Sequence, residues 1–317
     1  MVERLVANEK VVGSSPIARS KIKYIILLDL SFIFQQIANF FIKKRKIIIF
    51  YKFLFKIFKF VLKKKIVLNF ARFKFYVYPN KKDLSFWMLR YLKIWDEPKI
   101  NLILNESGKS DFTFIDIGCN YGAYSIPISK INKNSKIYAF DPSEKSISRI
   151  KENIRLNKIF NIELFNIGIA DKRKKVFFDD NINNYKNSGS FQISSNNYGK
   201  EILVESIDNL IEQKIIKPKK KIFIKMDIEG YEFYALQGLK KSLKNYKIFI
   251  LFEFSKKIFE NHLNLEKSFT NFIKENNLMI FDKKMRVISV KYLFENIHKI
   301  PKEWDVLDDF IIINQNL

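Results

Sequence analysis

Residues 114–122 read FIDIGCNYG, an apolar strand pattern that runs into a glycine-rich turn and then into a helix pattern. Gly118 and Gly122 have no Cβ, so the backbone can turn tightly there and approach a ligand closely. The helix after Gly122 offers unpaired N–H groups to an anionic group such as a carboxylate. Asp116 stands at the strand end, where it can accept hydrogen bonds from an ammonium. Together these features predict a nucleotide-type binding loop.

The segments around this loop alternate between strand and helix patterns. Short apolar runs bounded by turn residues predict strands at 113–117, 136–140, 162–167, 222–226 and 248–254. Helix patterns lie at 123–130, 144–157, 231–243 and 266–275. Two further runs, 278–281 and 310–313, are expected to close the sheet as an antiparallel pair. We therefore expect an α/β fold with a Rossmann-like, mostly parallel sheet and helices on both faces.

Three other segments have weaker patterns. Residues 69–78 predict one strand, and residues 85–92 predict a short helix. The stretch 179–197 is rich in Asn and Ser and predicts a long loop.

A second acidic residue follows the second predicted strand. Residues 139–142 read AFDP, which places Asp141 at the carboxyl end of that strand. An acid in this place can accept hydrogen bonds from both hydroxyls of a ribose. Taken alone, Asp141 could equally cap the following helix at 143–151. Beside the first motif, it is expected to bind the ligand.

The third motif is IKMDIEGYE at residues 224–232, where the fourth predicted strand ends. Ligands of open α/β sheets lie beyond the carboxyl ends of the strands, so Asp227 and Glu229 are expected to contact a cofactor or an acceptor hydroxyl. Either carboxylate could act as a general base. Glu232 is expected to cap the following helix. Glu253 is an acid within an apolar strand and is expected to be paired or to face the cleft.

In order and spacing these motifs resemble the FkbM-type methyltransferases, over about residues 73–314. The most specific matching segment is 225–238, which contains KMDIEGYE and LQG. The other matching segments are 116–122, 140–142, 187–190, 204–210 and Glu253. The resemblance implies a class I methyltransferase fold, S-adenosylmethionine as the cofactor, and methylation of a hydroxyl on a sugar, a glycan or another small acceptor.

The resemblance also implies roles for single residues. The cofactor-binding residues would be Asp116, Gly118, Cys119, Asn120 and Gly122 at the methionine end, and Asp141 and Pro142 at the ribose end. The catalytic residues would be Asp227 and Glu229, one of which takes the proton of the acceptor hydroxyl. The substrate region would contain Ser188, Ser190 and Glu253. Two residues depart from the family pattern: Cys119 stands where Ala is usual, and Asp141 where Glu is usual.

Two other classes of protein stay open at this stage. An NAD-dependent oxidoreductase shares the Rossmann-type fold, although the loop reads G-x-N-x-G rather than G-x-G-x-x-G. A non-catalytic protein could instead bind a membrane surface or a nucleic acid through the basic segment 43–76. The presence of Asp116, Asn120, Asp141 and Asp227 together favours the methyltransferase.

The composition narrows the possible partners. The formal net charge is +24, and the segment 43–76 holds twelve Lys or Arg and no acid. The remaining charge is spread along a Lys- and Asn-rich sequence, so nucleic acid is not an expected partner. The single cysteine, Cys119, excludes an intrachain disulfide and a thiolate zinc site. His262 and His298 lack the spacing of metal ligands, so no metal is expected.

The sequence divides into three parts. Residues 1–20 lack the Lys, Phe and Ile bias of the rest, and we interpret them as a misplaced start. Residues 21–68 predict a basic, apolar helical extension, and residues 69–317 the methyltransferase domain. Within the extension, the segment 43–65 predicts an amphipathic helix that either lies on an anionic membrane surface or packs on the domain. The expected location is the cytoplasm, at the inner membrane surface if this helix binds there; the oligomeric state stays open.

Overall fold

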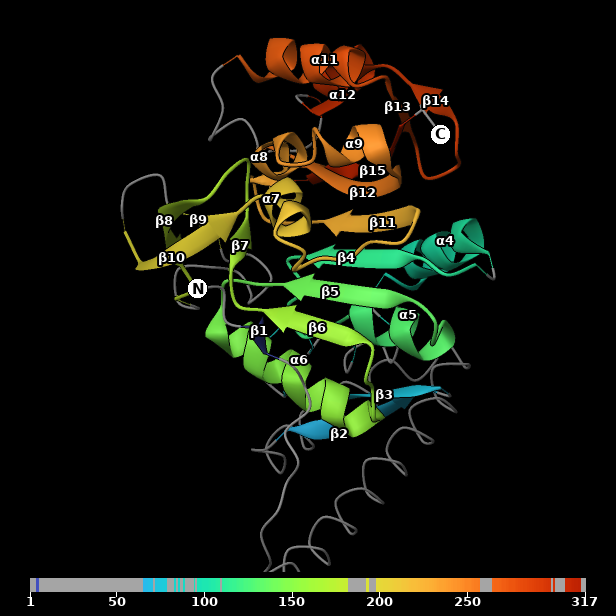
Figure 1. Cartoon of the computed structure of the whole chain (residues 1–317), viewed down its shortest axis with the longest axis vertical. Coiled ribbons are helices and arrows are strands. Elements are labelled where there is room, and N and C mark those ends of the chain that lie inside the picture. Colours follow the sequence, from blue (N-terminus) through green and yellow to red (C-terminus); the bar gives the residue numbers. More distant parts are fainter. Residues whose placement is uncertain are drawn as a thin grey trace, which may run out of the picture.

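The computed structural model describes residues 4–5, 65–70, 72–78, 83, 85, 88, 94, 96–108, 110–181, 192–193, 198–256, 264–297, 299 and 306–314. Within these ranges the centre of the molecule is a nine-stranded sheet (Figure 1). Its strands in spatial order are β1 (Arg4–Leu5), β6 (Ile162–Phe165), β5 (Lys136–Phe140), β4 (Thr113–Ile117), β11 (Lys221–Met226), β12 (Lys247–Ser255), β15 (Val306–Asn314), β13 (Leu278–Phe281) and β14 (Val287–Ile288).

The middle of this sheet is parallel. β6, β5, β4, β11 and β12 pair as parallel neighbours, whereas β15 runs antiparallel to both β12 and β13. These parallel strands are apolar along most of their length because both faces of the sheet are covered. β4 and β5 have the predicted bounds, and β6, β11 and β12 differ from the prediction only at their ends. The structure confirms the α/β class, the mostly parallel sheet and the closing antiparallel pair.

The two faces of the sheet have separate apolar cores, because successive residues of a strand point to opposite sides. In β4, Ile115 and Ile117 belong to one core and Phe114 belongs to the other. The Ile115 core is covered by α7 (Ile207–Glu212), α8 (Glu232–Gln237), α9 (Ser242–Asn245), α11 (Leu265–Glu275) and α12 (Val290–Ile297). The Phe114 core is covered by α4 (Glu97–Ser107), α5 (Ser125–Ile131) and α6 (Glu144–Asn157).

The helices match the sequence patterns unevenly. α6 has the predicted bounds, and α5 and α11 overlap their predicted ranges. The predicted helix 231–243 is wrong as a single helix: α8 ends at Gly238, where an added Cβ would lie 2.2 Å from the carbonyl oxygen of Ala170. α4 was not predicted. Apart from isolated positions, the predicted helix 85–92 lies outside the described residues.

The segment before α4 forms a hairpin rather than the single predicted strand. β2 (Ile66–Phe70) and β3 (Phe73–Val77) pair antiparallel, so the predicted domain boundary at residue 69 falls inside β2. Two side chains of α6 bind the backbone of the hairpin. Asn157 Oδ1 accepts from Lys74 N at 2.7 Å, and Asn153 Oδ1 accepts from Tyr76 N at 2.8 Å. The hairpin therefore extends the core on the α6 side.

A small second sheet lies beside the carboxyl ends of the parallel strands. In Figure 1 the arrowheads of β4, β5 and β6 point to the side on which it stands. Its order is β7 (Gly168–Ile169), β10 (Lys200–Glu205), β8 (Lys174–Asp179), β9 (Gln192–Ile193). The predicted loop 179–197 is wrong at β9, which pairs with the end of β8. Ser188 and Ser190 lie outside the described residues.

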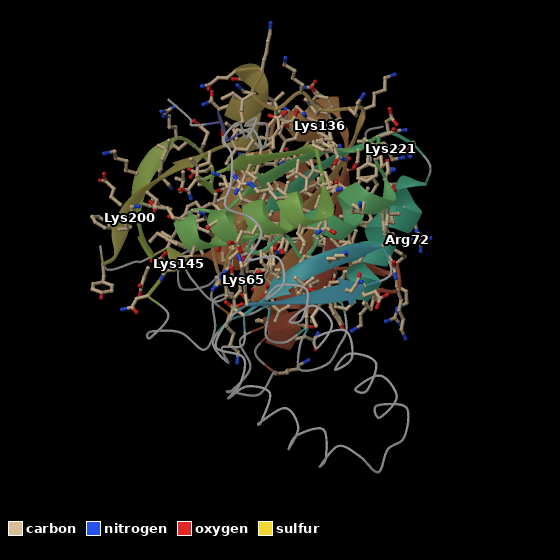
Figure 2. The ribbon with its side chains drawn as sticks, turned by 90° about the horizontal axis from the view of Figure 1, so that it is seen from below. Lys65, Arg72, Lys136, Lys145, Lys200 and Lys221 are labelled. Carbon is tan, nitrogen blue, oxygen red and sulfur yellow. The ribbon has the colours of Figure 1, made fainter. Side chains whose placement is uncertain are left out.

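Basic side chains are spread over the molecule, among them Lys65 and Arg72 at the hairpin and Lys145 on α6 (Figure 2). Several are paired with acids: Lys65 with Glu152 at 2.6 Å, and Lys136 with Glu163 at 2.5 Å. These ion pairs offset part of the positive charge of the protein. The predicted amphipathic helix 43–65 lies outside the described residues except for Lys65. Among the helices that are described, none is long and apolar enough to cross a bilayer.

Candidate active site

The carboxyl ends of β4, β5 and β11 surround a cavity of about 820 Å³. Its lining brings together most of the predicted site residues, namely Asp116, Gly118, Cys119, Asn120, Asp141, Pro142, Asp227 and Glu229. Gly122 is not in the lining, and Glu253 lines a neighbouring cavity. A concave site beyond the carboxyl ends of parallel strands is where small molecules and cofactors bind in open α/β sheets.

The two loop glycines are required for different reasons. Gly118 has φ +80°, and a Cβ there would lie 2.2 Å from the backbone oxygen of Asp227. Gly118 therefore lets the loop after β4 meet the loop after β11. Gly122 has φ +88°, and its Cβ would press on the side chain of Ile150 at 2.9 Å. The requirement at Gly122 is therefore close packing against α6 rather than contact with a ligand.

Asp116 presents a buried acceptor to the cavity. Its side chain is 1% exposed, and Oδ2 accepts a hydrogen bond from Ser125 Oγ at 2.5 Å. Oδ1 is buried and has no hydrogen-bond partner among the described residues. Burial raises the pKa of Asp116, against the opposing effects of Lys225 and Ser125. A ligand that donates a hydrogen bond, above all a cationic one, would satisfy this oxygen.

Asp141 connects two loops. Its Oδ2 accepts from the backbone N of Asn120 at 2.9 Å, and its Oδ1 accepts from Ser143 N at 2.9 Å. The side chain of Ser143 caps α6, so the alternative role of Asp141 as the helix cap is wrong. Burial raises the pKa of Asp141 to about 6, against these two backbone hydrogen bonds. Asp141 therefore fixes Asn120 and still lines the cavity.

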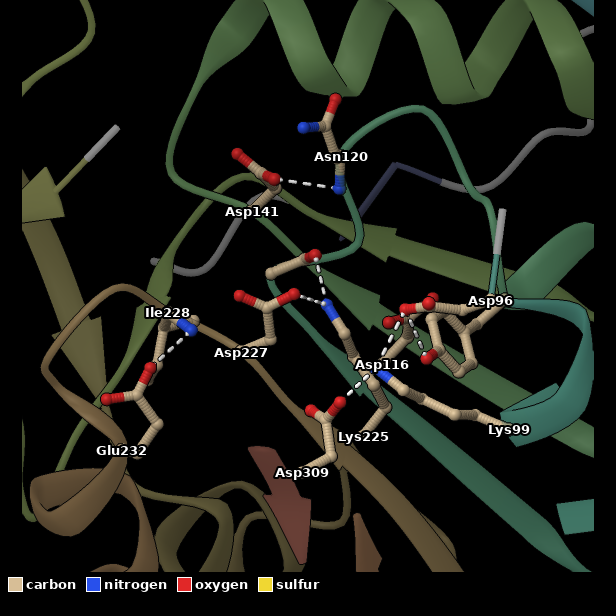
Figure 3. A network of polar contacts seen from close by, with 12 residues as sticks. Asp96, Lys99, Asp116, Asn120, Asp141, Lys225, Asp227, Ile228, Glu232 and Asp309 are labelled. Atoms are coloured by element: carbon tan, nitrogen blue, oxygen red, sulfur yellow. Dashed lines mark hydrogen bonds and ion pairs between the residues drawn. The ribbon is translucent and has the colours of Figure 1, made fainter. Parts of the chain in front are cut away.

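Lys225 is a site residue that the motifs did not single out. It is 7% exposed, and its Nζ donates to Gly118 O at 3.1 Å and pairs with Asp227 Oδ2 at 3.0 Å (Figure 3). Burial opposes its charge, but Asp227 and Asp116 outweigh that effect and raise the pKa of Lys225. The sequence does contain a signal for Lys225: it is a charged residue inside an otherwise apolar strand, as Glu253 is.

Asp227 and Glu253 are hydrogen-bonded to each other, and their pKa values shift in opposite directions. Burial would raise the pKa of Asp227, but Lys225 and a hydrogen bond from Glu253 outweigh it and lower that pKa. Burial raises the pKa of Glu253, and the charges of Asp227 and Glu229 add to the effect. The pKa of Asp227 is therefore lowered while that of Glu253 is raised, so the negative charge of the pair is favoured on Asp227.

Glu232 holds the loop after β11. It is fully buried, and its carboxylate accepts from the backbone N of Ile228 and of Gly230, both at 2.8 Å. Burial raises the pKa of Glu232 to about 8, against the hydrogen bond from Ile228 N. Glu232 is the first residue of α8, whose N-cap is Tyr231, and its carboxylate binds the preceding loop instead of capping the helix as predicted. The loop places Glu229, at φ +57°, on the cavity wall.

The model of the methyltransferase FkbM domain matches residues 116–279, from the aspartate of the first loop to β13. The chain belongs to this family. It is a methyltransferase, and its cofactor is S-adenosylmethionine, as the family resemblance implied. The observed sheet order and the match together confirm the resemblance seen in the motifs.

Individual relatives of this FkbM methyltransferase are distant. The 2-O-methyltransferase NoeI of Sinorhizobium fredii is 24% identical over 173 residues, which are 50% of this chain and 69% of NoeI. Solved structures include M. jannaschii TYW2 in complex with AdoMet, with TM-score 0.38 and 13% identity over 78% of this chain and 84% of that chain. A SAM-dependent methyltransferase from Aquifex aeolicus has TM-score 0.35 and 14% identity over 73% and 93%. These TM-scores are low, and the assignment rests on the family match.

The residues around the large cavity fit S-adenosylmethionine. The partnerless Oδ1 of Asp116 suits the ammonium of its methionine part. The absence of a Cβ at Gly118 lets the loop after β4 approach the loop after β11 beside the carboxylate of Asp116. Asp141 offers a carboxylate on the same cavity wall, where ribose hydroxyls need an acceptor.

Proposed function

We propose that this methyltransferase transfers the methyl group to a hydroxyl oxygen of a small or sugar-like acceptor. The observation that carries the proposal is the environment of Asp227, a cavity-wall carboxylate kept ionised by Lys225 and hydrogen-bonded by Glu253. A hydroxyl nucleophile needs a proton acceptor of this kind within hydrogen-bond reach. The name of NoeI, a 2-O-methyltransferase, supports the same chemistry.

The cavity residues have separate proposed roles in binding the cofactor. Asp116 accepts hydrogen bonds from the ammonium, and Asp141 accepts them from the ribose hydroxyls. Gly118, Cys119, Asn120 and Pro142 form the wall between these two carboxylates. Ser188 and Ser190 stay predicted members of the substrate region.

Asp227 is the proposed base. S-adenosylmethionine supplies a methyl group bound to a positively charged sulfur. As that methyl group passed to the acceptor oxygen and left the sulfur, the hydroxyl proton would become strongly acidic, and Asp227 would accept it. A carboxylate with a lowered pKa suffices for a proton that leaves late. Alignment of the acceptor supplies much of the rate, up to about 7–11 kcal/mol.

Glu229 is the second candidate for the base, because it lines the same cavity from the same loop. Asp227 is the first candidate because Lys225 and Glu253 hold its negative charge in place. We therefore expect Asp227→Asn to lower turnover by at least about a hundredfold. Glu229→Gln is expected to lower it only a few-fold.

The experiment measures S-adenosylhomocysteine release and methylated product by mass spectrometry, with a panel of neutral methyl glycosides as acceptors. Amino-sugar glycosides of the same rings serve as the matched comparison. Methylation on oxygen, lost in Asp227→Asn with cofactor binding intact, is the expected result. Unchanged turnover in Asp227→Asn would refute the base assignment. Methylation only on nitrogen would refute the oxygen acceptor.

A further inference from the structure

A second cavity, of about 520 Å³, adjoins the cofactor cavity and has no assigned role. The two cavities share the side chains of Tyr124, Lys225 and Asp227. The rest of its lining comes from α4 and its cap, β11, β12 and β15, and consists of Asp96, Lys99, Met226, Leu251, Glu253 and Asp309. Asp227, the proposed base, therefore faces both cavities.

The polar groups of the second cavity are fixed by one another (Figure 3). Lys99 pairs with Asp309 and with Asp96, in the second case at 3.2 Å. The Tyr124 hydroxyl donates to the same oxygen of Asp96 at 2.9 Å. This network joins α4 to β15 and to Tyr124, the N-cap residue of α5. The groups are pre-organised, which reduces the entropy that a ligand must lose on binding.

The charge of this lining is negative overall. Asp96, Asp227 and Asp309 supply carboxylates, against the ammonium groups of Lys99 and Lys225. Burial raises the pKa of Asp309 to about 6, against the effect of Lys99, so Asp309 is ionised at pH 8. Each carboxylate oxygen can accept more than one hydrogen bond, so acceptor capacity remains after the ion pairs have formed.

We propose that this second cavity is the acceptor compartment, and that it takes a polyhydroxylated ring without negative charge and rejects anionic acceptors. This inference rests on the proposed function. Hydroxyl groups donate to carboxylates such as Asp96 and Asp309, while an acceptor hydroxyl reaches Asp227 on the shared wall. A carboxylate on the acceptor would be buried beside like charges, which is unfavourable. Asp309 and Lys99 are then specificity-determining residues outside the cofactor cavity.

The test uses the full chain loaded with S-adenosylhomocysteine at pH 8. Binding of methyl glucopyranoside and methyl glucuronopyranoside is compared by titration calorimetry or saturation-transfer NMR. These probes differ only in one CH₂OH or carboxylate group. We expect the neutral glycoside to bind at least about tenfold more tightly, a difference of about 1.4 kcal/mol. Equal or tighter binding of the glucuronide, or binding of neither probe, would overturn the proposal.

Two variants test whether residues of the second cavity cause the preference for the neutral glycoside. Asp309→Asn and Asp96→Asn each remove one negative charge, so each should weaken glucoside binding about fivefold or more and narrow the preference over the glucuronide. Glu201→Gln, at an exposed position of β10, is the matched control and should change neither affinity. Thermal unfolding and affinity for S-adenosylhomocysteine confirm folding. If both variants keep cofactor binding and the glycoside preference is unchanged, the acceptor compartment is refuted but the proposed function is not. If the wild type does not bind S-adenosylhomocysteine, the proposed function itself is refuted.

Discussion

At the scale of single residues, Lys225 connects the parts of the site. Its ammonium lies between the carbonyl of Gly118 and the carboxylate of Asp227, so one side chain joins the loops after β4 and β11. Its positive charge also acts on Asp116. The charge state of both carboxylates therefore depends on a lysine that itself contacts the cavity.

We expect Lys225→Met to lower the free energy of unfolding by about 1–3 kcal/mol, because it leaves a buried carbonyl and a carboxylate without their donor. Lys175→Met is the matched control: Lys175 pairs with Glu201 at the surface, with side chains 70% and 51% exposed. That change should cost less than about 1 kcal/mol. Urea denaturation of both variants compares them. Equal losses would show that the Lys225 contacts add no stability.

Local sequence patterns identified Asp116, Asp141 and Asp227, because each stands at the carboxyl end of an apolar strand. Position relative to a strand is encoded within a few residues. Lys99 and Asp309 could not be found in this way. Their contact joins α4 to β15, elements separated by most of the chain, and it exists only once the sheet has formed. Their roles depend on tertiary structure.

At the scale of elements, the loop between β4 and α5 sets the geometry of the cofactor cavity. Gly118 and Gly108 both have positive φ, of +80° and +63°. A Cβ at Gly108 meets nothing within 4 Å, whereas at Gly118 it meets the backbone of Asp227. An alanine at either glycine would therefore strain the backbone, but only an alanine at Gly118 would also clash with another loop.

We expect Gly108→Ala to cost about 1–2 kcal/mol of stability and to leave affinity for S-adenosylmethionine unchanged. Gly118→Ala adds a clash that forces the loops after β4 and β11 apart, so it should also abolish measurable cofactor binding. Calorimetric titration and urea denaturation of both variants provide the readouts. Normal cofactor affinity in folded Gly118→Ala would contradict this account of the loop.

Elements with strong local patterns were predictable, whereas those that depend on partners were not. α6 has its predicted bounds because its cap residue, Ser143, and its apolar positions are local. The prediction missed β2 of the β2–β3 hairpin, whose strand β3 is held by Asn153 and Asn157 of the distant α6. The predicted helix 231–243 is interrupted after Gln237, and the next residue, Gly238, lies against the distant Ala170 with no room for a side chain.

At the scale of the whole molecule, burial of acids determines the pH dependence of stability. Burial raises the pKa of Asp141 and Asp309 to about 6 and that of Glu232 to about 8. A carboxyl group with a raised pKa binds its proton more tightly in the folded state. Its contribution to stability is complete below the unfolded pKa and is lost as pH rises through the folded pKa.

We therefore expect the free energy of unfolding to fall as the pH rises from about 5 to about 8. Urea denaturation at several pH values measures this slope. Glu232→Gln should be less stable overall, because its amide nitrogen cannot accept a backbone hydrogen bond, but it should flatten the upper part of the slope. A free energy of unfolding that rises across this range in the wild type would contradict the raised pKa values.

The most direct test of the central claim is calorimetric titration of the full chain with S-adenosylmethionine, S-adenosylhomocysteine and NAD. We predict micromolar binding of the first two and none of NAD. Asp116→Asn should weaken the binding of both by about tenfold or more, because it removes a charge-assisted hydrogen bond to the ammonium. Asp111→Asn, at an exposed position before β4, should change nothing. Binding of NAD, with none of either methionine derivative to the folded protein, would contradict the cofactor site.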